Sequence, residues 1–323
     1  MTCIRYGRKF RLEKVKPSLI DVRTEAEFDA GIPTTLIQGL LIQFLIKYQI
    51  QIQREVRIVD YKEIQYILYD ELRLMHYPIA VKFIFDDTEL EDFKNNVTYH
   101  IPVHPITFCQ FEIGPRMKGQ TILGTKATLG CASAQYVFGW KPLDDAEIKS
   151  HLKYTRDMAQ AERFLRTKPR LPEGKLRAFI VSPLADSYFA PDVVHFYCDN
   201  MQAYHLVVDY MAAMDVHPLR PSLTMSSSAC GGSVFSYNEG TLNMLTACSG
   251  SYNSGKTERG EINIMIPGEH IEPVTQRLLD RKKLHGSSSI TRPGDLFPGA
   301  DVCKNCPLIV CVKSKDSKNP PNC

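Results

Sequence analysis

The stretch "PDVVHFYCDNMQAYHLVVDYM" (residues 191–211) joins a strand to a helix, and our prediction of the fold starts from it. Its first part, "DVVHFYC" (192–198), is a short apolar run typical of a buried strand. The residues that follow, "NMQAYHLVVDYMAAM" (200–214), have the pattern of a helix, and Asn200 is a suitable N-cap because its side chain accepts from free backbone N–H groups. We therefore predict a strand that leads directly into a helix.

A similar succession occurs earlier in the chain, which indicates an internal repeat. "PIAVKF" (78–83) corresponds to "PDVVHF" (191–196), and after each comes a glutamine-bearing helix start and then a cysteine followed by small residues and an aromatic residue. The matched pairs are Gln110 with Gln202 and Cys131 with Cys230. We therefore expect two related α/β halves, which form one core and bring distant cysteines together.

Hydrophobic periodicity predicts further elements around these two stretches. They are helices over residues 61–76, 144–167 and 272–283 and strands over residues 79–85 and 261–267. The mixed order of helices and strands predicts an α/β or α+β fold. We divide the chain into an N-terminal segment (1–60), a core (61–285) and a cysteine-rich tail (286–323) that contains many Ser, Gly, Pro and Lys residues.

Composition limits the classes of protein to consider. The chain has 323 residues, of which 44% are hydrophobic and 23% charged, as in an ordinary globular protein. A net charge of +3, without a basic block between aromatic residues, predicts no nucleic-acid binding. The longest apolar run (34–53) is interrupted by Gln38, Gln43 and Lys47, so we expect no membrane span. The first residues lack the apolar core of a signal peptide, and we expect a cytoplasmic protein.

The N-terminal segment contains "PSLIDVRTEAEFDAGIP" (17–33), which resembles the opening strand and helix of a rhodanese. The histidine that usually follows the glycine is missing at Ile32, and no catalytic cysteine loop comes after it. We therefore assign no sulfur transfer to this segment.

The chain has ten cysteines, and five of them lie in the core. Cys198 ends an apolar strand, where we expect it to pack as an apolar residue; the other four, called the four core cysteines here, are Cys109, Cys131, Cys230 and Cys248. Without a secretory signal, metal or redox chemistry explains a high cysteine count better than disulfides do. Spacings of 22, 99 and 18 residues do not fit the paired CxxC knuckles of a zinc ribbon. All four stand beside small or polar residues, whose unhindered backbone N–H groups suit an iron–sulfur cluster. Burial as small apolar residues is the alternative.

The segment "LTACSGSYNSGKTERGE" (245–261) raises the question of what Cys248 does. "GSYNSGKT" (250–257) has the spacing of a phosphate-binding P-loop, but a strand-like segment follows it instead of a helix, so we reject that interpretation. Lys256 and Arg259 add positive charge that suits an anionic cluster or ligand. Glycines beside the cysteines permit close approach of a ligand to the backbone. The residues that we expect to contact a cofactor are Gly231, Gly232, Gly250, Lys256 and Arg259.

The tail contains "CKNCPLIVC" (303–311), whose CxxC spacing is typical of ligands to zinc or an iron–sulfur cluster. The predicted metal ligands of the tail are Cys303, Cys306, Cys311 and Cys323. The alternative is a disordered tail with incidental thiols.

The motifs "YPIAVKF", "FCQFEIGPRMKGQTILGTKATLGCASAQYVFG", "SSSACGG" and "TACSGSYNSGKTERGEINIMIPGEH" together resemble the bacterial and archaeal family called domain of unknown function 169. The resemblance extends from about Tyr61 to Arg281 and implies that the family's cysteines match the four in the core. The chain departs from the family in "CASAQ", which has less glycine, and at Tyr252, where the family often has arginine. The family name records no activity, so the resemblance implies a domain and not a reaction.

Three functions remain open on this evidence. The first is a cytoplasmic thiolate-metal protein with an iron–sulfur cluster, which is redox-linked or accessory in anaerobic metabolism and works with a redox partner protein. The second is an enzyme in which Cys230 or Cys248 is a nucleophile, with Glu261 or a histidine as base. The third is a module that binds a small-molecule ligand in a cleft.

Overall fold

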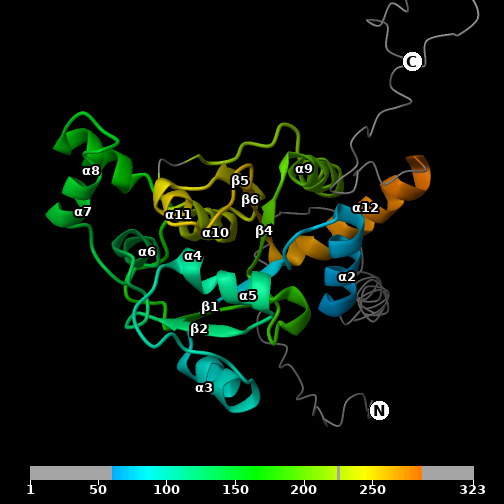
Figure 1. Ribbon diagram of the computed structural model, residues 1–323, viewed down its shortest axis with the longest axis horizontal. Coiled ribbons are helices and arrows are strands. Elements are labelled where there is room, and N and C mark those ends of the chain that lie inside the picture. The colour runs from blue at the N-terminus through cyan, green and yellow to red at the C-terminus, as the bar shows by residue number, and fades with distance from the viewer. Residues whose placement is uncertain (1–59, 224–225, 286–323) are drawn as a thin grey trace, which may run out of the picture. The chain divides into compact units, whose positions relative to one another are not determined.

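A six-stranded sheet forms the centre of the computed structural model, which describes residues 60–223 and 226–285 (Figure 1). Its strand order is β2-β3-β1-β4-β6-β5, and each neighbouring pair is antiparallel. The strands are β1 (Ile79–Ile84), β2 (Ile122–Thr125), β3 (Ala178–Pro183), β4 (Val193–Cys198), β5 (Asn243–Thr246) and β6 (Ile262–Pro267). Of the two predicted classes, this mixed domain with an antiparallel sheet corresponds to α+β.

The central strands β1 and β4 are buried on both faces of the sheet. In β4 every residue is buried, which explains why its sequence is almost continuously apolar. Val193 and Tyr197 point into one hydrophobic cluster, and Val194 and Phe196 point into another on the opposite face. The predicted strands over 79–85, 192–198 and 261–267 are thus confirmed as β1, β4 and β6.

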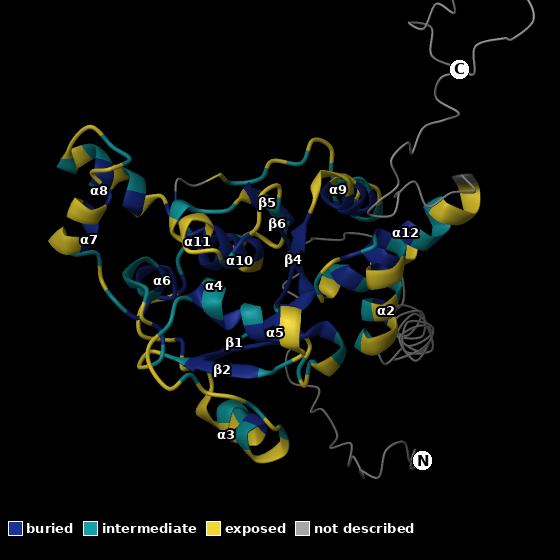
Figure 2. Cartoon of the chain, in the orientation of Figure 1, coloured by how far each residue is buried: buried dark blue, intermediate teal, exposed yellow. Residues whose placement is uncertain are grey.

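One face of the sheet is covered by short helices and by α10 (Ser228–Glu239). The short helices are α4 (Phe108–Phe111), α5 (Ile113–Lys118) and α6 (Ala132–Val137). Phe108, Phe138 and Phe179 meet edge to face or tilted, at centroid distances of 5.1–5.2 Å, and form the aromatic centre of this cluster. Figure 2 shows that the strands beneath these helices are buried.

The other face is covered by α2 (Tyr61–Leu72), α9 (Asn200–Met214) and α12 (Ile271–His285), and α3 (Asp87–Asn96) packs beside β1. Arg281 of α12 donates two hydrogen bonds of 2.7 Å to the buried carboxylate of Asp209 in α9. Lys282 of α12 pairs with Glu71 of α2 at 2.6 Å. Ion pairs therefore connect α12 to both α9 and α2, in addition to apolar contacts.

The predicted helix over 61–76 is shorter than expected, because Arg73 takes a left-handed conformation that ends α2 at Leu72. Met75, which was expected on its buried face, is exposed. The predicted N-cap of α9 is wrong by one residue. Asp199, and not Asn200, accepts from the N–H groups of Met201 and Gln202, and Gln202 completes a capping box.

The single helix predicted over 144–167 is wrong. The segment forms α7 (Asp145–Ser150) and α8 (Met158–Arg166), because Asp157 caps a new helix by accepting from the Gln160 N–H at 2.7 Å. The connection between these two helices places His151 and its neighbours beside the candidate site.

The predicted match of Cys131 with Cys230 is wrong, since Cys131 follows strand β2 whereas Cys230 precedes strand β5. The related halves themselves stay a prediction. Residues 17–33, the apolar run 34–53 and the four tail cysteines lie outside the described residues. Within the described ranges, no helix has both the length and the apolar character needed to cross a membrane.

Candidate functional site

A cavity of about 250 Å³ lies beside α4, α6, α10 and α11 (Ser249–Asn253), which come together on one side of the sheet in Figure 1. All four core cysteines line it: Cys109, Cys131, Cys230 and Cys248. They come from four segments, and the first two of these segments are separated from the last two by 99 residues. The structure thus brings these four cysteines to the wall of one cavity, whereas their predicted loop positions are wrong. Each stands inside a helix or at its N-cap.

Cys248 is the N-cap of α11 and differs from the other three cysteines in its surroundings. Burial raises the pKa of its thiol, but several hydrogen bonds lower it by more, so the pKa lies below its ordinary value. The donors are the backbone N–H groups of Ser251, Ser228 and Ser227 and the Ser228 hydroxyl. In addition, the Cys248 N–H donates to Ser228 Oγ at 2.9 Å. These contacts stabilise a thiolate.

The donors come from the N-terminal turns of two helices, α10 and α11. Ser227, the N-cap of α10, has a φ of 64°, which is uncommon for a residue other than glycine. This conformation occurs where the successive backbone N–H groups of Ser227 and Ser228 donate to the Cys248 sulfur. Such local strain is often found at functional sites.

The other three cysteines are protonated thiols at neutral pH. Burial raises the pKa of Cys109 and Cys131. Burial, with the nearby Cys131 and Cys248, raises the pKa of Cys230 well above its ordinary value. Only Cys248 therefore has surroundings that favour the thiolate among the cysteines lining the cavity.

A buried polar network forms part of the cavity wall through His151 and Ser227, and Lys168 lies behind it. Lys168 Nζ donates to Ser227 Oγ at 3.1 Å and stands 3.3 Å from His151 Nε2. The same imidazole nitrogen lies 3.0 Å from Ser226 Oγ. Burial lowers the pKa of both Lys168 and His151. The Glu147 carboxylate accepts a hydrogen bond from the Ser133 hydroxyl.

The residues predicted to contact a cofactor occupy three different places. Gly250 and Lys256 line the cysteine cavity. Gly231 and Gly232 lie inside α10 and are not among its lining residues; a Cβ at Gly232 would meet the side chain of Met265 at 2.7 Å, so this glycine allows α10 to pack closely on the sheet. Arg259 lines a second cavity.

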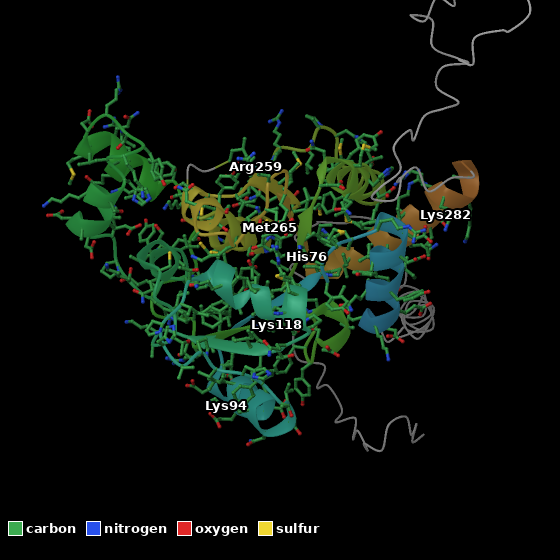
Figure 3. All side chains as sticks on the ribbon, viewed as in Figure 1. His76, Lys94, Lys118, Arg259, Met265 and Lys282 are labelled. Atoms are coloured by element: carbon green, nitrogen blue, oxygen red, sulfur yellow. The ribbon has the colours of Figure 1, made fainter. Side chains whose placement is uncertain are left out.

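The second cavity, of about 160 Å³, is lined by His76, Tyr197, Arg259 and Glu261 among others; Figure 3 labels His76 and Arg259. Arg116 Nη2 donates to Glu261 Oε1 at 3.1 Å and lies 3.2 Å from His76 Nε2, and its guanidinium stacks on Tyr197 at 4.0 Å. Glu261 ends the segment that begins at Cys248, so this buried ion pair holds the far end of that segment.

Further buried polar side chains lie next to Arg116. Glu112, which is fully buried, accepts from His195 Nδ1 at 2.6 Å and from the Tyr197 hydroxyl at 2.7 Å. Its negative charge also contributes to the raised pKa of Cys109. Tyr197 thus connects Glu112 with Arg116, which stacks on its ring.

No ready metal site is present in residues 60–223 and 226–285. No three or more His, Cys, Asp or Glu side chains in these ranges stand in a group that could hold a metal ion. The five cysteines of the described ranges are all free thiols.

Several residues of the site had no recognisable signal in the sequence. Lys168 and His151 belong to the polar network, and Lys153 and Tyr154 line the cavity. They reach the site only because the predicted helix breaks between α7 and α8. Ser226, Ser227 and Ser228 did carry a signal, since they belong to the motif "SSSACGG" of the family resemblance.

Comparison with known proteins gives one result. Residues 67–277 match the family model of DUF169, described as "Uncharacterised ArCR". No curated protein and no solved structure matches the chain. The N-terminal rhodanese-like segment lies outside the matched range. Because the matched residues make up well over half of the 323 residues, the chain belongs to the DUF169 family.

Proposed function

We propose that the cysteine cavity binds a small molecule and that Cys248 acts on it as a thiolate nucleophile. One observation carries this proposal: the Cys248 sulfur lies in the cavity wall and accepts hydrogen bonds from two helix N-termini and a serine hydroxyl. A thiolate held in this way is the reactive form of cysteine. The cavity provides a recessed space in which part of a ligand's surface loses contact with water.

In the step that we propose, the thiolate sulfur gives an electron pair to an electrophilic carbon of the ligand. A carbon–sulfur bond forms, and the bond from that carbon to its leaving group breaks with its electron pair. Cys109, Cys131 and Cys230 remain protonated and do not compete for the ligand.

Limited alkylation tests this function. The native protein is treated with iodoacetamide in less than molar equivalence to its thiols, and peptide mass spectrometry identifies the modified cysteine. We expect modification at Cys248 before the other core cysteines. Cys248→Ser should abolish the fast phase, whereas Cys198→Ser, which changes a buried cysteine outside this cavity, should preserve it. Earlier modification of Cys109 or Cys131 than of Cys248 would contradict the proposal.

We propose as a second candidate that the four core cysteines hold an iron–sulfur cluster and that the protein exchanges electrons with a redox partner. The convergence of four cysteines from four segments on one cavity supports this function. Since the described residues contain no preassembled metal group, the sulfurs have to move toward one another when the cluster binds.

Anaerobic purification with iron and sulfide analysis tests the second candidate. We expect stoichiometric iron and sulfide, and we expect Cys109→Ser and Cys131→Ser each to lose them. A shorter chain that ends at residue 292 separates this site from zinc or an iron–sulfur cluster in the tail, where Cys303, Cys306, Cys311 and Cys323 are the proposed ligands. Colourless, iron-free protein with a fast Cys248 thiol would favour the first function over the second.

We also propose that the core contains two related halves. From the centre outward, the strands follow β1-β3-β2 on one side and β4-β6-β5 on the other. The outer strands are β2 and β5, and in each half one cysteine precedes the outer strand and one follows it. This order pairs Cys109 with Cys230, and Cys131 with Cys248. An experimental structure in which the two strand triplets do not superpose would disprove this relation.

A further inference from the structure

We infer that the ligand of the cysteine cavity is a small organic anion. This inference rests on the function proposed for the cavity and adds the charge of the molecule that Cys248 attacks. Neither the family description nor the thiol chemistry defines that charge, because thiolates attack neutral and anionic carbon compounds alike.

Apart from the Cys248 thiolate itself, the charged side chains of the cavity wall are all lysines. Lys153 and Lys256 line the cavity, and no Asp or Glu does so among the described residues. Neither ammonium group forms an ion pair within the described ranges; Lys153 lies 5.0 Å from the ring centroid of Tyr154. The charge of Lys256 reaches the cysteines, since it helps to lower the pKa of Cys109 against the larger effect of burial. The ammonium groups of Lys153 and Lys256 can therefore attract a negatively charged ligand.

The charged groups behind the wall do not reverse this balance. The nearest carboxylate, Glu147, is buried and already accepts from the Ser133 hydroxyl, and its Oε1 lies 3.7 Å from His151 Nδ1. Lys168 lies close enough for Glu147 to influence its pKa, so one buried cation faces this carboxylate. The two charges offset each other, and the cations at the wall remain.

Hydroxyl groups complete a surface that suits oxygen-rich anions. Thr107, Ser133 and Ser249 line the cavity, and Tyr154 forms a hydrogen bond with Ser249. Hydroxyls can donate to carboxylate or phosphate oxygens at any neutral pH. The volume of about 250 Å³ restricts the ligand to a small metabolite.

Two alkylating agents that differ in charge test this inference. Iodoacetamide is neutral and iodoacetate is anionic; with each, the sulfur of Cys248 forms a bond to the CH₂ carbon and iodide leaves. We measure the rate constant of each agent at Cys248 by peptide mass spectrometry and divide the iodoacetate value by the iodoacetamide value. Glutathione supplies the same ratio for a free thiol.

We expect the ratio at Cys248 to exceed that of glutathione by about fivefold, the effect of one unit charge at close range in water. Lys256→Met should lower the ratio toward the glutathione value, Lys256→Arg should retain it, and added salt should reduce it. Lys175→Met, a change at an exposed lysine outside the cavity, should leave it unchanged. Because both agents react with the same thiolate, the ratio of their rate constants does not depend on any effect of Lys256 on the thiolate population.

A ratio equal to that of glutathione, or one that Lys256→Met does not change, would overturn the inference. The rate constant for iodoacetamide keeps this failure separate from failure of the proposed function. A Cys248 that reacts rapidly with iodoacetamide but shows no preference for iodoacetate retains its function as a nucleophile and loses only the anionic ligand. A Cys248 that does not react with iodoacetamide contradicts both.

Discussion

Replacement of Ser228 by alanine tests how the protein stabilises the Cys248 thiolate. The Ser228 hydroxyl donates to the sulfur and also accepts from the Cys248 N–H at 2.9 Å. The substitution removes both contacts and leaves the backbone donors of Ser227, Ser228 and Ser251 in place. We therefore expect a weaker but still perceptible preference for the thiolate.

The magnitude follows from the hydrogen bonds that are lost. A hydrogen bond to a charged group contributes about 1.5–3 kcal/mol, and about 1.4 kcal/mol changes an equilibrium tenfold. At any pH below the pKa of Cys248, Ser228→Ala should therefore reduce the thiolate population, and with it the alkylation rate, by about tenfold or more. The unpaired Cys248 N–H should lower the free energy of unfolding by roughly 1 kcal/mol.

The assay is the pseudo-first-order rate of iodoacetamide modification at Cys248, with urea unfolding to confirm that the variant is folded. Ser233→Ala is the matched control, because Ser233 lies in the same helix, is fully buried, and donates to the Ala229 carbonyl at 2.8 Å without contact to Cys248. A folded Ser228→Ala variant that reacts at the rate of the unaltered protein would refute the reasoning.

Three further predictions concern stability and accessibility. Arg116→Ala leaves the mostly buried Glu261 with only His76 and the Glu258 N–H as partners and should lower the free energy of unfolding in urea by about 2 kcal/mol, whereas Arg177→Ala, at an exposed ion pair, should change it by less than about 1 kcal/mol. Gly268→Ala places a Cβ against the Pro191 carbonyl and should destabilise the fold by at least about 1–3 kcal/mol, whereas Gly250→Ala, with Cys248 Sγ at 4.0 Å, should be tolerated. Cys230, which is 6% exposed, should resist maleimide labelling in the native state and react once urea unfolds the protein; labelling at equal rates in both states would disprove its burial.

The parts of the fold that could be predicted are those with a clear local pattern. β1, β4 and β6 are apolar runs, and α9 and α12 have helical patterns, so sequence alone located them. β2 and β5 have four residues each, too few to show a period. The predicted strands β1, β4 and β6 thus lie inside the sheet, whereas the edge strands β2 and β5 and the interior strand β3 were missed.

Helix α10 was missed for a different reason. Its sequence "SACGGSVFSYNE" contains two glycines and four small residues at its start, which resemble a loop. Tertiary packing overrides that low helix propensity, because the small residues let α10 approach Met265 closely. A residue inside α10, such as Cys230, was therefore assigned to a loop.

Three cysteines of the site, Cys131, Cys230 and Cys248, could be singled out because each stands among small residues; Cys109, between Phe108 and Gln110, joined them through a polar neighbour and the family resemblance. Lys168 and His151 were not, since a lysine or histidine near a helix is common and their meeting depends on the break between α7 and α8. Arg116 and Glu261 are 145 residues apart, and only the packing of α5 beside the end of the Cys248 segment brings them together. Such long-range contacts leave no local signal in a single sequence.

The central claim, that Cys248 is a thiolate nucleophile, is tested most directly by the pH dependence of its alkylation. Thiolate forms as the pH rises through the pKa, and hydrogen bonds lower this pKa at Cys248, whereas burial raises the pKa of Cys109 and Cys131. Peptide mass spectrometry of the native protein gives the iodoacetamide rate constant at each cysteine from pH 5 to 10. Our account predicts that the alkylation rate of Cys248 is half-maximal at a lower pH than that of glutathione. For Cys109 and Cys131 it predicts that the rate is half-maximal at a higher pH than for glutathione. A half-maximal rate at Cys248 at or above the glutathione value would contradict it.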